Sequence, residues 1–180
     1  MRLKILVACE FSGIYRNAFA VLGHDAWSCD LLDTEIPGQH HVGDVTEFLY
    51  DQKWDLLVAH PPCTYLCNSG VRWLYGGKGK SRDLKRWNAM EDAADFFRAF
   101  WDAPVPCIAI ENPTMHRYGR EAIWNDDERP TPHTVQPWNF GIREMKATCW
   151  WLKGLPPLVA TNNVGPPPKD PELRKHWAKV

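Results

Sequence analysis

The sequence predicts an α/β domain built around a doubly wound, mostly parallel sheet. Two observations carry this prediction: short apolar runs alternate with helical segments, and several of these runs end in a polar residue or a turn. Buried parallel strands appear as continuous apolar runs, because helices cover both faces of such a sheet. The length of 180 residues, 44% of them hydrophobic, suits one compact domain with a sizeable core.

The N-terminal half contains three candidate strands and two helical segments. The candidate strands are apolar runs at residues 3–9, 26–30 and 54–60. Residues 14–22 have a helical pattern that Gly23 ends, and a short helical piece follows at 46–50. Residues 31–42 between them are expected to form a loop.

The C-terminal half is expected to begin with a long amphipathic helix capped by Ser81. Its apolar side chains recur close to the helical period: Leu84, Trp87, Ala94, Phe97 and Trp101. Further candidate strands are residues 105–110, 133–140 and 147–152. Residues 114–133 are polar and are expected to be irregular. One domain over residues 1–160 and a proline-rich tail over 161–180 are therefore expected.

Composition excludes several classes of protein. The net charge of -1 gives no global basic signature for nucleic-acid binding, so such binding requires a local patch. No apolar run approaches the length of a membrane span, and the apolar N-terminus is too short for a signal peptide. The six cysteines are spread through the chain and four fall in apolar runs, which indicates reduced thiols in a cytoplasmic protein.

The most informative stretch is the apolar run that ends at His60, Pro61, Pro62 and Cys63. Two prolines stop the strand and impose a rigid turn, because they neither continue a strand ladder nor enter a helix interior. A thiol directly after this turn lies at the carboxyl end of a buried strand, where α/β folds place their chemistry. Cys63 is therefore a candidate nucleophile, and a buried structural thiol is the alternative.

Acidic residues follow the other candidate strands, and they suggest a nucleoside cofactor. Asp30 comes 17 residues after Gly13, at a spacing that suits an acceptor for ribose hydroxyls. Gly13 is followed by Ile14, Tyr15 and Arg16 in place of the further glycines that a dinucleotide pyrophosphate requires. A nucleoside without phosphates does not need them, so S-adenosylmethionine is favoured over a nicotinamide cofactor. Simple strand termination is the alternative for Asp30, and a turn role the alternative for Asp44, which follows Gly43.

In order along the chain, Phe11-Ser12-Gly13, Asp30, Gly43-Asp44-Val45, Pro61-Pro62-Cys63 and Glu111-Asn112-Pro113 resemble the cytosine-5 DNA methyltransferases. The resemblance covers roughly residues 3–155 and is to small, phage-type members without a separate target-recognition domain. It implies the Rossmann-like fold of the class I S-adenosylmethionine-dependent methyltransferases. It also implies DNA as partner, and a cytoplasmic enzyme of the phage-encoded type.

The resemblance implies a role for each matching residue. Cys63 would attack carbon 6 of cytosine, Glu111 would serve ring nitrogen 3, and Asn112 would brace the loop. The implied cofactor-binding residues are Phe11, Ser12, Gly13, Asp30, Asp44 and Pro61. In place of the family's Gln-x-Arg-x-Arg element stand Glu144, Lys146 and Thr148, and Lys146 is expected to contact oxygen 2 of the base. No metal is expected.

DNA contact is expected from residues 64–87, of which 64–80 are glycine-rich and read as a mobile loop. Six basic residues lie here against one acid, interleaved with aromatic residues: Arg72, Lys78, Lys80, Arg82, Lys85 and Arg86. Basic side chains supply phosphate affinity, and aromatic rings supply stacking. A solvated surface is the alternative reading. With no room for a recognition domain, sequence specificity is expected to be short, or to come from a homodimer or a partner subunit.

Three other functions are compatible with the sequence. An amino-methyltransferase carries an acid or amide before Pro-Pro and an aromatic residue after it, where this chain has His60 and Cys63. A non-catalytic, methyltransferase-like binder of nucleic acid or protein is a second alternative. A modified donor that delivers a group larger than methyl, near Tyr15 and Arg16, is a third. Zinc binding by His60, Cys63 and Cys67 is disfavoured because a fourth ligand is missing.

Overall fold

The computed structural model describes residues 1–76, 81–124 and 129–177. It contains a seven-stranded sheet in the order β3-β2-β1-β4-β5-β7-β6. The strands are β1 (Lys4–Ala8), β2 (Asp25–Asp30), β3 (His40–Val42), β4 (Leu56–Ala59), β5 (Cys107–Pro113), β6 (His133–Val135) and β7 (Thr148–Lys153). The first five run parallel, and β7 and β6 are antiparallel to their neighbours. This is a Rossmann-like fold, as the sequence predicts.

Strand β1 lies inside the sheet between β2 and β4, and it is buried on both faces. Ile5, Leu6, Val7 and Ala8 are all fully buried, as expected for a parallel strand between two covered faces. Strand β3 lies within residues 31–42, which were expected to be a loop. That expectation is wrong at residues 40–42, which form an edge strand. The strand has only three residues, two of them histidines, so no apolar run marks it in the sequence.

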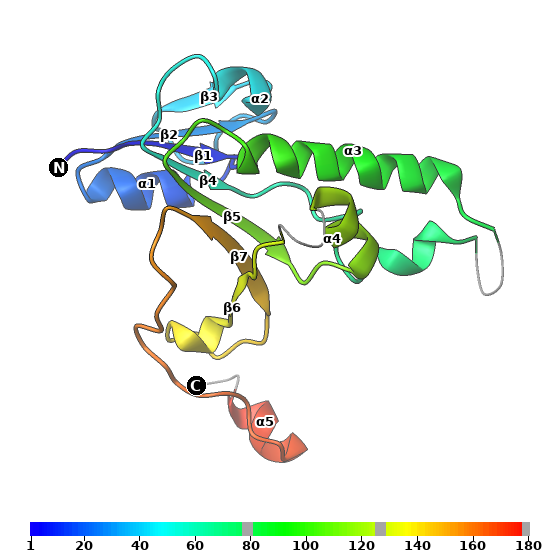
Figure 1. Cartoon of the computed structure of the whole chain (residues 1–180). Helices are drawn as coiled ribbons and strands as arrows, with labels where there is room; N and C mark the ends of the chain where they lie inside the picture. The colour runs from blue at the N-terminus through cyan, green and yellow to red at the C-terminus, as the bar shows by residue number, and fades with distance from the viewer. Residues whose placement is uncertain (77–80, 125–128, 178–180) are drawn as a thin grey trace.

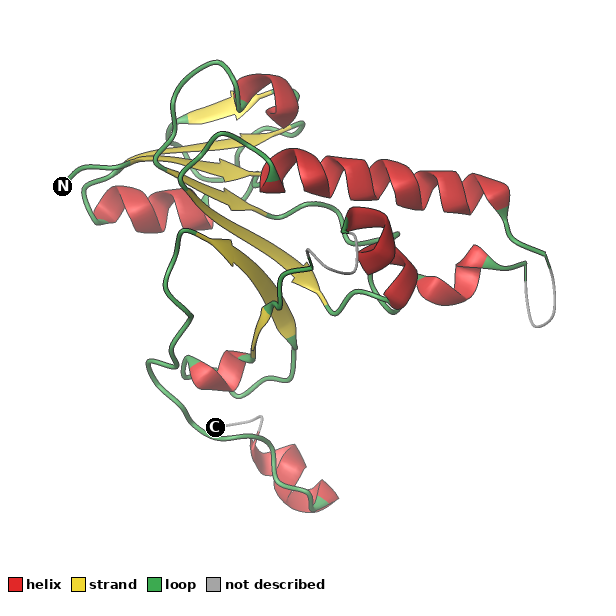
Figure 2. Cartoon of the chain, viewed as in Figure 1, coloured by secondary structure: helices red, strands yellow, loops and turns green. Residues whose placement is uncertain are grey.

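The two faces of the sheet carry different helices (Figure 2). Helix α1 (Ile14–Val21) packs on β1 and β2, and α3 (Leu84–Trp101) packs on the opposite face with α4 (Arg117–Ile123) beside it. The α3 face holds the main core, to which α3 contributes Met90, Ala94, Phe97 and Phe100. The N-cap of α3 is Asp83, whose carboxylate accepts from the Arg86 amide, and not Ser81. Leu84 does not join the buried stripe, because it is 72% exposed.

The segments after β5 differ most from the sequence-based expectation. Residues 114–133 contain α4, whose N-cap His116 accepts through Nδ1 from the Gly119 amide. The strand expected at 133–140 ends at Val135, and the short 3-10 helix η3 (Pro137–Asn139) follows it. The proline-rich tail ends in α5 (Pro171–Trp177), where Trp177 contacts Trp138 of η3. Among the described residues no helix is long and apolar enough to cross a membrane.

Residues 64–76 form ordered turns and not an open loop. Leu66 and Leu74 are buried in the core, and the 3-10 helix η1 (Val71–Leu74) precedes the bridge between Tyr75 and Arg82. The Asn68 amide donates to the Thr114 carbonyl, and the His116 amide donates to the Leu66 carbonyl. These bonds fix the segment after Cys63 to the start of α4. Lys78 and Lys80 lie outside the described residues.

Arg16 ties α1 to β2 and to the loop that follows β2. Its side chain is 1% exposed, and its guanidinium donates to Ser28 Oγ, Thr34 Oγ1, Asn17 Oδ1 and the Ile36 carbonyl. Gly13 and Gly38 lie against this group, since a Cβ on either would come within 3 Å of it. Arg16 is therefore a structural residue that joins α1 to β2 and the loop after it.

Replacing Arg16 with Met should destabilise the fold by about 3 kcal/mol, because several buried acceptors lose a charged donor. In a chain of this size this corresponds to a fall in the thermal midpoint of roughly 6–12 °C. Differential scanning calorimetry measures it. The exposed Arg120→Met on α4 is the matched control and should change stability by less than about 0.5 kcal/mol. Equal stability of the two variants would contradict the assigned role of Arg16.

Candidate active site

The parallel register brings the polar strand ends together at one edge of the sheet. Ala8 pairs with Ala59 of β4 and with Cys29 of β2, and Ala59 pairs with Ile110 of β5. The residues that follow these positions are therefore neighbours at the carboxyl edge: Cys9, Glu10, Asp30, His60 and Glu111. This is the edge at which open α/β sheets bind ligands.

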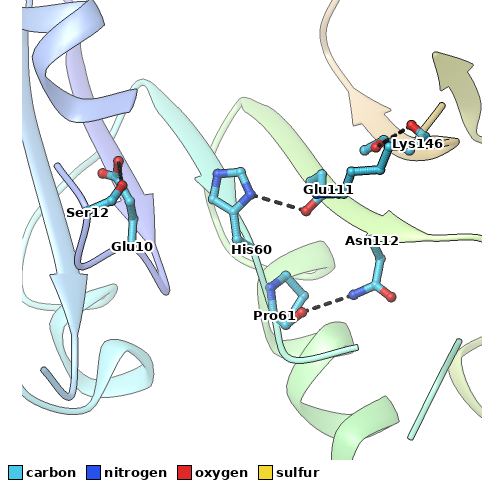
Figure 3. Close-up of polar contacts among 8 residues, drawn as sticks. Glu10, Ser12, His60, Pro61, Glu111, Asn112 and Lys146 are labelled. Carbon is cyan, nitrogen blue, oxygen red and sulfur yellow. Dashed lines mark hydrogen bonds and ion pairs between the residues drawn. The ribbon is translucent and has the colours of Figure 1, made fainter. Parts of the chain in front are cut away.

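The turn that carries the thiol is braced from the neighbouring strand. Asn112 is fully buried, and its Nδ2 donates to the Pro61 carbonyl over 3.0 Å (Figure 3). Its Oδ1 is buried without a hydrogen-bond partner among the described residues. A single buried amide therefore connects the Glu111-Asn112 strand end to the Pro-Pro-Cys turn.

Cys63 is half-buried and begins a helical turn that places Cys67 beside it. The amide of Cys67 donates to the Cys63 carbonyl over 3.0 Å, and Cys67 Sγ lies 2.9 Å from Ser69 Oγ. Burial, the Cys67 charge and the hydrogen bond with Cys67 raise the pKa of Cys63, and Glu111 adds to the effect. Burial opposes ionisation of Cys67 as well, but bonds from Ser69, Gly70 and Cys63 outweigh it and lower the Cys67 pKa. The two thiols therefore titrate as an interacting pair.

Glu111 faces His60, and two aromatic rings enclose the pair. His60 Nδ1 lies 3.4 Å from Glu111 Oε2, and no other polar partner of Glu111 occurs in the described part of the chain (Figure 3). The His60 ring lies 4.6 Å from the Tyr15 ring and 5.9 Å from the Trp150 ring, between centroids. Burial, followed by the charges of Glu111 and Glu10, raises the pKa of Tyr15. The position of His60 at a strand end was the one sign of this contact in the sequence.

A small cavity of about 230 Å³ lies on the β2 side of the edge and contains the two predicted cofactor acids. Asp30, Asp44, Cys9 and Pro62 are among its lining residues. Cys9 has a φ of 57°, a left-handed conformation that is rare for a residue with a side chain. Burial, followed by the charges of Asp30, Cys29 and Asp44, raises the pKa of Cys9 to about 12, so this thiol stays protonated.

The two acids of the small cavity also have structural roles. Asp30 Oδ1 accepts from the Leu32 amide at the end of β2. Asp44 is the N-cap of α2 (Val45–Phe48), and its Oδ1 accepts from the Thr46 hydroxyl and the Thr46 amide. These two bonds lower the pKa of Asp44. Each acid retains a second oxygen, Oδ2, for which no bond within the described residues is found.

Glu10 closes the N-terminus of α1. It is 5% exposed, and its carboxylate accepts from the amides of Tyr15 and Arg16 and from the Ser12 hydroxyl (Figure 3). A phosphate at this helix end would meet a buried carboxylate in place of free amides. Because Glu10 occupies the amides at this helix end, the site does not fit a dinucleotide pyrophosphate. It does fit a nucleoside without phosphates. Gly13 has the left-handed φ of 74° that this turn requires.

Phe11, Ser12 and Lys146 lie outside the small cavity, although all three were predicted as site residues. Phe11 is 39% exposed and does not line this cavity. Lys146 instead lines a groove of about 840 Å³ on the α1 face of the sheet, together with Glu111, His60 and Tyr15. Gln136 also lines this groove, and its Oε1 accepts from the Lys146 amide over 3.1 Å. Sequence reasoning did not single out Gln136; Glu144, which it matched to the family's glutamine, is exposed.

The described basic residues after Cys63 stack on aromatic rings. The guanidinium groups of Arg72, Arg82 and Arg86 lie within 5 Å of the ring centroids of Trp73, Trp87 and Tyr65, in that order. Lys85 is exposed on the first turn of α3, whose N-terminal end projects beyond the sheet (Figure 1). The arrangement offers exposed cations and ring faces to a ligand.

Alkylation of Cys63 should have a pH midpoint above that of a free cysteine, because burial and Cys67 disfavour its thiolate. Cys67→Ala should move the midpoint down, since the neighbouring negative charge disappears, while burial keeps it from falling far. Iodoacetamide labelling of Cys63 against pH, followed by peptide mass spectrometry, measures the midpoint. Cys107→Ala is the control and should leave it in place; an unchanged midpoint in Cys67→Ala would refute the coupling.

No family model and no curated protein matches the chain. A solved structure with the same fold is a protein of E. coli described as a candidate DNA modification methyltransferase encoded within a prophage. It is 17% identical to this chain, with a TM-score of 0.52 and coverage of 83% of this chain and 46% of that one. This chain thus spans about half the length of that protein. The likeness establishes the shared Rossmann-like fold.

Proposed function

We propose that this protein is a DNA methyltransferase that transfers a methyl group from S-adenosylmethionine to carbon 5 of cytosine. The observation that carries the proposal is the hydrogen bond from Asn112 to the Pro61 carbonyl. It joins the strand end bearing Glu111 to the turn bearing Cys63, and the charge of Glu111 contributes to the raised pKa of Cys63. The solved prophage protein supports DNA as the substrate class.

Carbon 5 of cytosine becomes nucleophilic only after a nucleophile adds to carbon 6. In the proposed reaction the Cys63 thiolate forms a bond to carbon 6, and the electron pair displaced through the ring takes a proton at nitrogen 3. Glu111 supplies this proton from its carboxyl group. The cofactor supplies an electrophilic methyl group, which carbon 5 accepts. Loss of the carbon 5 proton to a base then restores the double bond and releases the Cys63 thiolate, while nitrogen 3 returns its proton to Glu111.

The cofactor is assigned to the small cavity and the adjoining edge. Asp30 would accept the ribose hydroxyls and Asp44 the adenine amino group, each through an oxygen that the fold leaves unbonded. Phe11, Ser12 and Gly13 would border the cofactor on the α1 side, and Pro61 on the β4 side. A nucleoside without phosphates agrees with the closure of the α1 N-terminus by Glu10.

The target base is assigned to the sheet edge between Cys63 and Glu111, next to the large groove that Glu111 and Lys146 line. A cytosine reaches such a site only after leaving the duplex. The phosphates on either side would bind the described basic residues Arg72, Arg82, Lys85 and Arg86, and further cations at Lys78 and Lys80 belong to the same proposal. Because the chain spans about half of the solved prophage protein, sequence recognition is assigned to these loops, to a second copy or to a partner subunit.

DNA that contains 5-fluorocytosine should form a stable covalent adduct with the protein in the presence of S-adenosylmethionine. Fluorine at carbon 5 cannot leave as a proton does, so the Cys63–carbon 6 bond persists. Denaturing electrophoresis measures the adduct. It should be absent in Cys63→Ser and present in Cys107→Ala. Methylation of adenine or of the cytosine amino group, without an adduct, would establish an amino-methyltransferase instead.

Asp30→Ala should weaken S-adenosylmethionine binding by roughly 10-fold or more, because the ribose hydroxyls lose a charged acceptor. Isothermal titration calorimetry gives the affinity. Asp25→Ala, at the opposite end of β2, is the matched control and should bind as the unaltered protein does. Equal affinity of Asp30→Ala and Asp25→Ala would remove Asp30 from the ribose role, and no binding by the unaltered protein would overturn the cofactor assignment.

A further inference from the structure

The contact between His60 and Glu111 has no role in the proposed reaction. His60 directly precedes the Pro-Pro-Cys turn, and its Nδ1 lies 3.4 Å from Glu111 Oε2. Its Nε2 is buried without a hydrogen-bond partner among the described residues. The long Nδ1–Oε2 distance is usual for a catalytic hydrogen bond before the substrate binds.

We propose that His60 is a positioning residue that fixes Glu111 for its contact with nitrogen 3 of the target cytosine. This inference rests on the proposed cytosine-5 methyltransferase function. In the tautomer with a proton on Nδ1, His60 donates to Oε2 of Glu111. The two oxygens of the carboxyl group then differ: Oε2 is held by His60, and Oε1 is left to carry the proton and to meet the base.

The surroundings of His60 allow it to hold this orientation. Its side chain is 17% exposed, and the rings of Tyr15 and Trp150 lie against it at interplanar angles of 50° and 81°. Rotation of the imidazole would therefore require movement of two packed aromatic side chains. Neither ring offers an acceptor to Nε2, so Glu111 is the one polar contact of the imidazole within the described residues.

The place of His60, directly after the last residue of β4, determines which side of Glu111 the imidazole contacts. Val58 of β4, His60 directly after β4, and Ala109 and Glu111 of β5 all line the large groove, as alternate residues on one face of two paired segments. The imidazole thus reaches Glu111 sideways, across the pair of strands, and leaves the groove side of the carboxyl group open. A polar side chain on the other face at this position would not reach Glu111.

Three substitutions separate positioning from general polarity. Asn places its Nδ2 where His60 has Nδ1, so His60→Asn retains a donor to Glu111. Gln places its amide nearer to the position of Nε2 and loses this contact, and Leu removes both nitrogens. The rate of covalent adduct formation with 5-fluorocytosine DNA should fall roughly 10–100-fold in His60→Leu and in His60→Gln, and by less than about 3-fold in His60→Asn.

Two controls keep the result interpretable. S-adenosylmethionine affinity and the thermal midpoint are measured for each variant, and the exposed His176→Leu on α5 should react at the unaltered rate. The KM for DNA should stay constant while kcat falls, because His60 acts through Glu111 and does not contact the phosphates. If His60→Leu loses activity because it does not fold, the comparison of His60→Asn with His60→Gln remains the test, since both variants keep a polar side chain.

The outcomes distinguish this inference from the proposed function. If the unaltered protein forms an adduct and His60→Asn reacts more than about 3-fold faster than His60→Gln, the positioning role is supported. Equal rates for Asn and Gln, or an unaltered rate in His60→Leu, would overturn it while the methyltransferase proposal stands. If the unaltered protein forms no adduct on 5-fluorocytosine DNA, the proposed function itself is overturned, and with it the reaction that His60 is inferred to assist.

Discussion

The structure depends on the parallel register of three central strands. Strands β1, β4 and β5 are in register at Ala8, Ala59 and Ile110, since Ala59 pairs with both of the other two residues. This alignment brings residues that are far apart in the sequence to one edge: the buried Glu10, then His60, then Glu111. The backbone hydrogen bonds between these strands therefore set the spacing of the residues at this edge. The fully buried side chains of β1 keep water away from these bonds. Chemistry placed here is therefore held by the most stable part of the fold.

The sequence predicted the parts of the fold that depend on local patterns. Apolar runs between turn residues identified the central strands, because a buried parallel strand has the same character on both faces. The errors arise where a non-local contact decides the structure. The short strand β3 exists because it pairs with β2, and α4 exists because His116 caps it while its Nε2 bonds the Tyr65 carbonyl. Asp83 caps α3 in preference to Ser81 because the helix begins at Leu84.

The same distinction applies to the candidate site. A thiol, an amide and acids at strand ends were visible in the sequence, and the structure places Asn112 against the turn that holds Cys63. The proximity of Cys67 to Cys63, which contributes to the raised pKa of Cys63, was not visible as chemistry. Nor was the position of Gln136 beside Lys146, because it depends on how the segment after β6 folds back toward β7. Their individual roles in a reaction stay predictions until the variants are measured.

The alternation of β5 has a consequence for how this protein can change in evolution. Glu111 lies on the groove face and Asn112 on the buried face, next to each other in the chain and on opposite sides of the sheet. Inserting or deleting a single residue early in β5 would exchange the two faces, burying the acid and exposing the amide. Substitutions can be sampled one at a time along this strand, but changes of length cannot. Descendants of this chain should therefore vary in length in their loops and tails, while the spacing from β5 to the Glu-Asn pair stays constant.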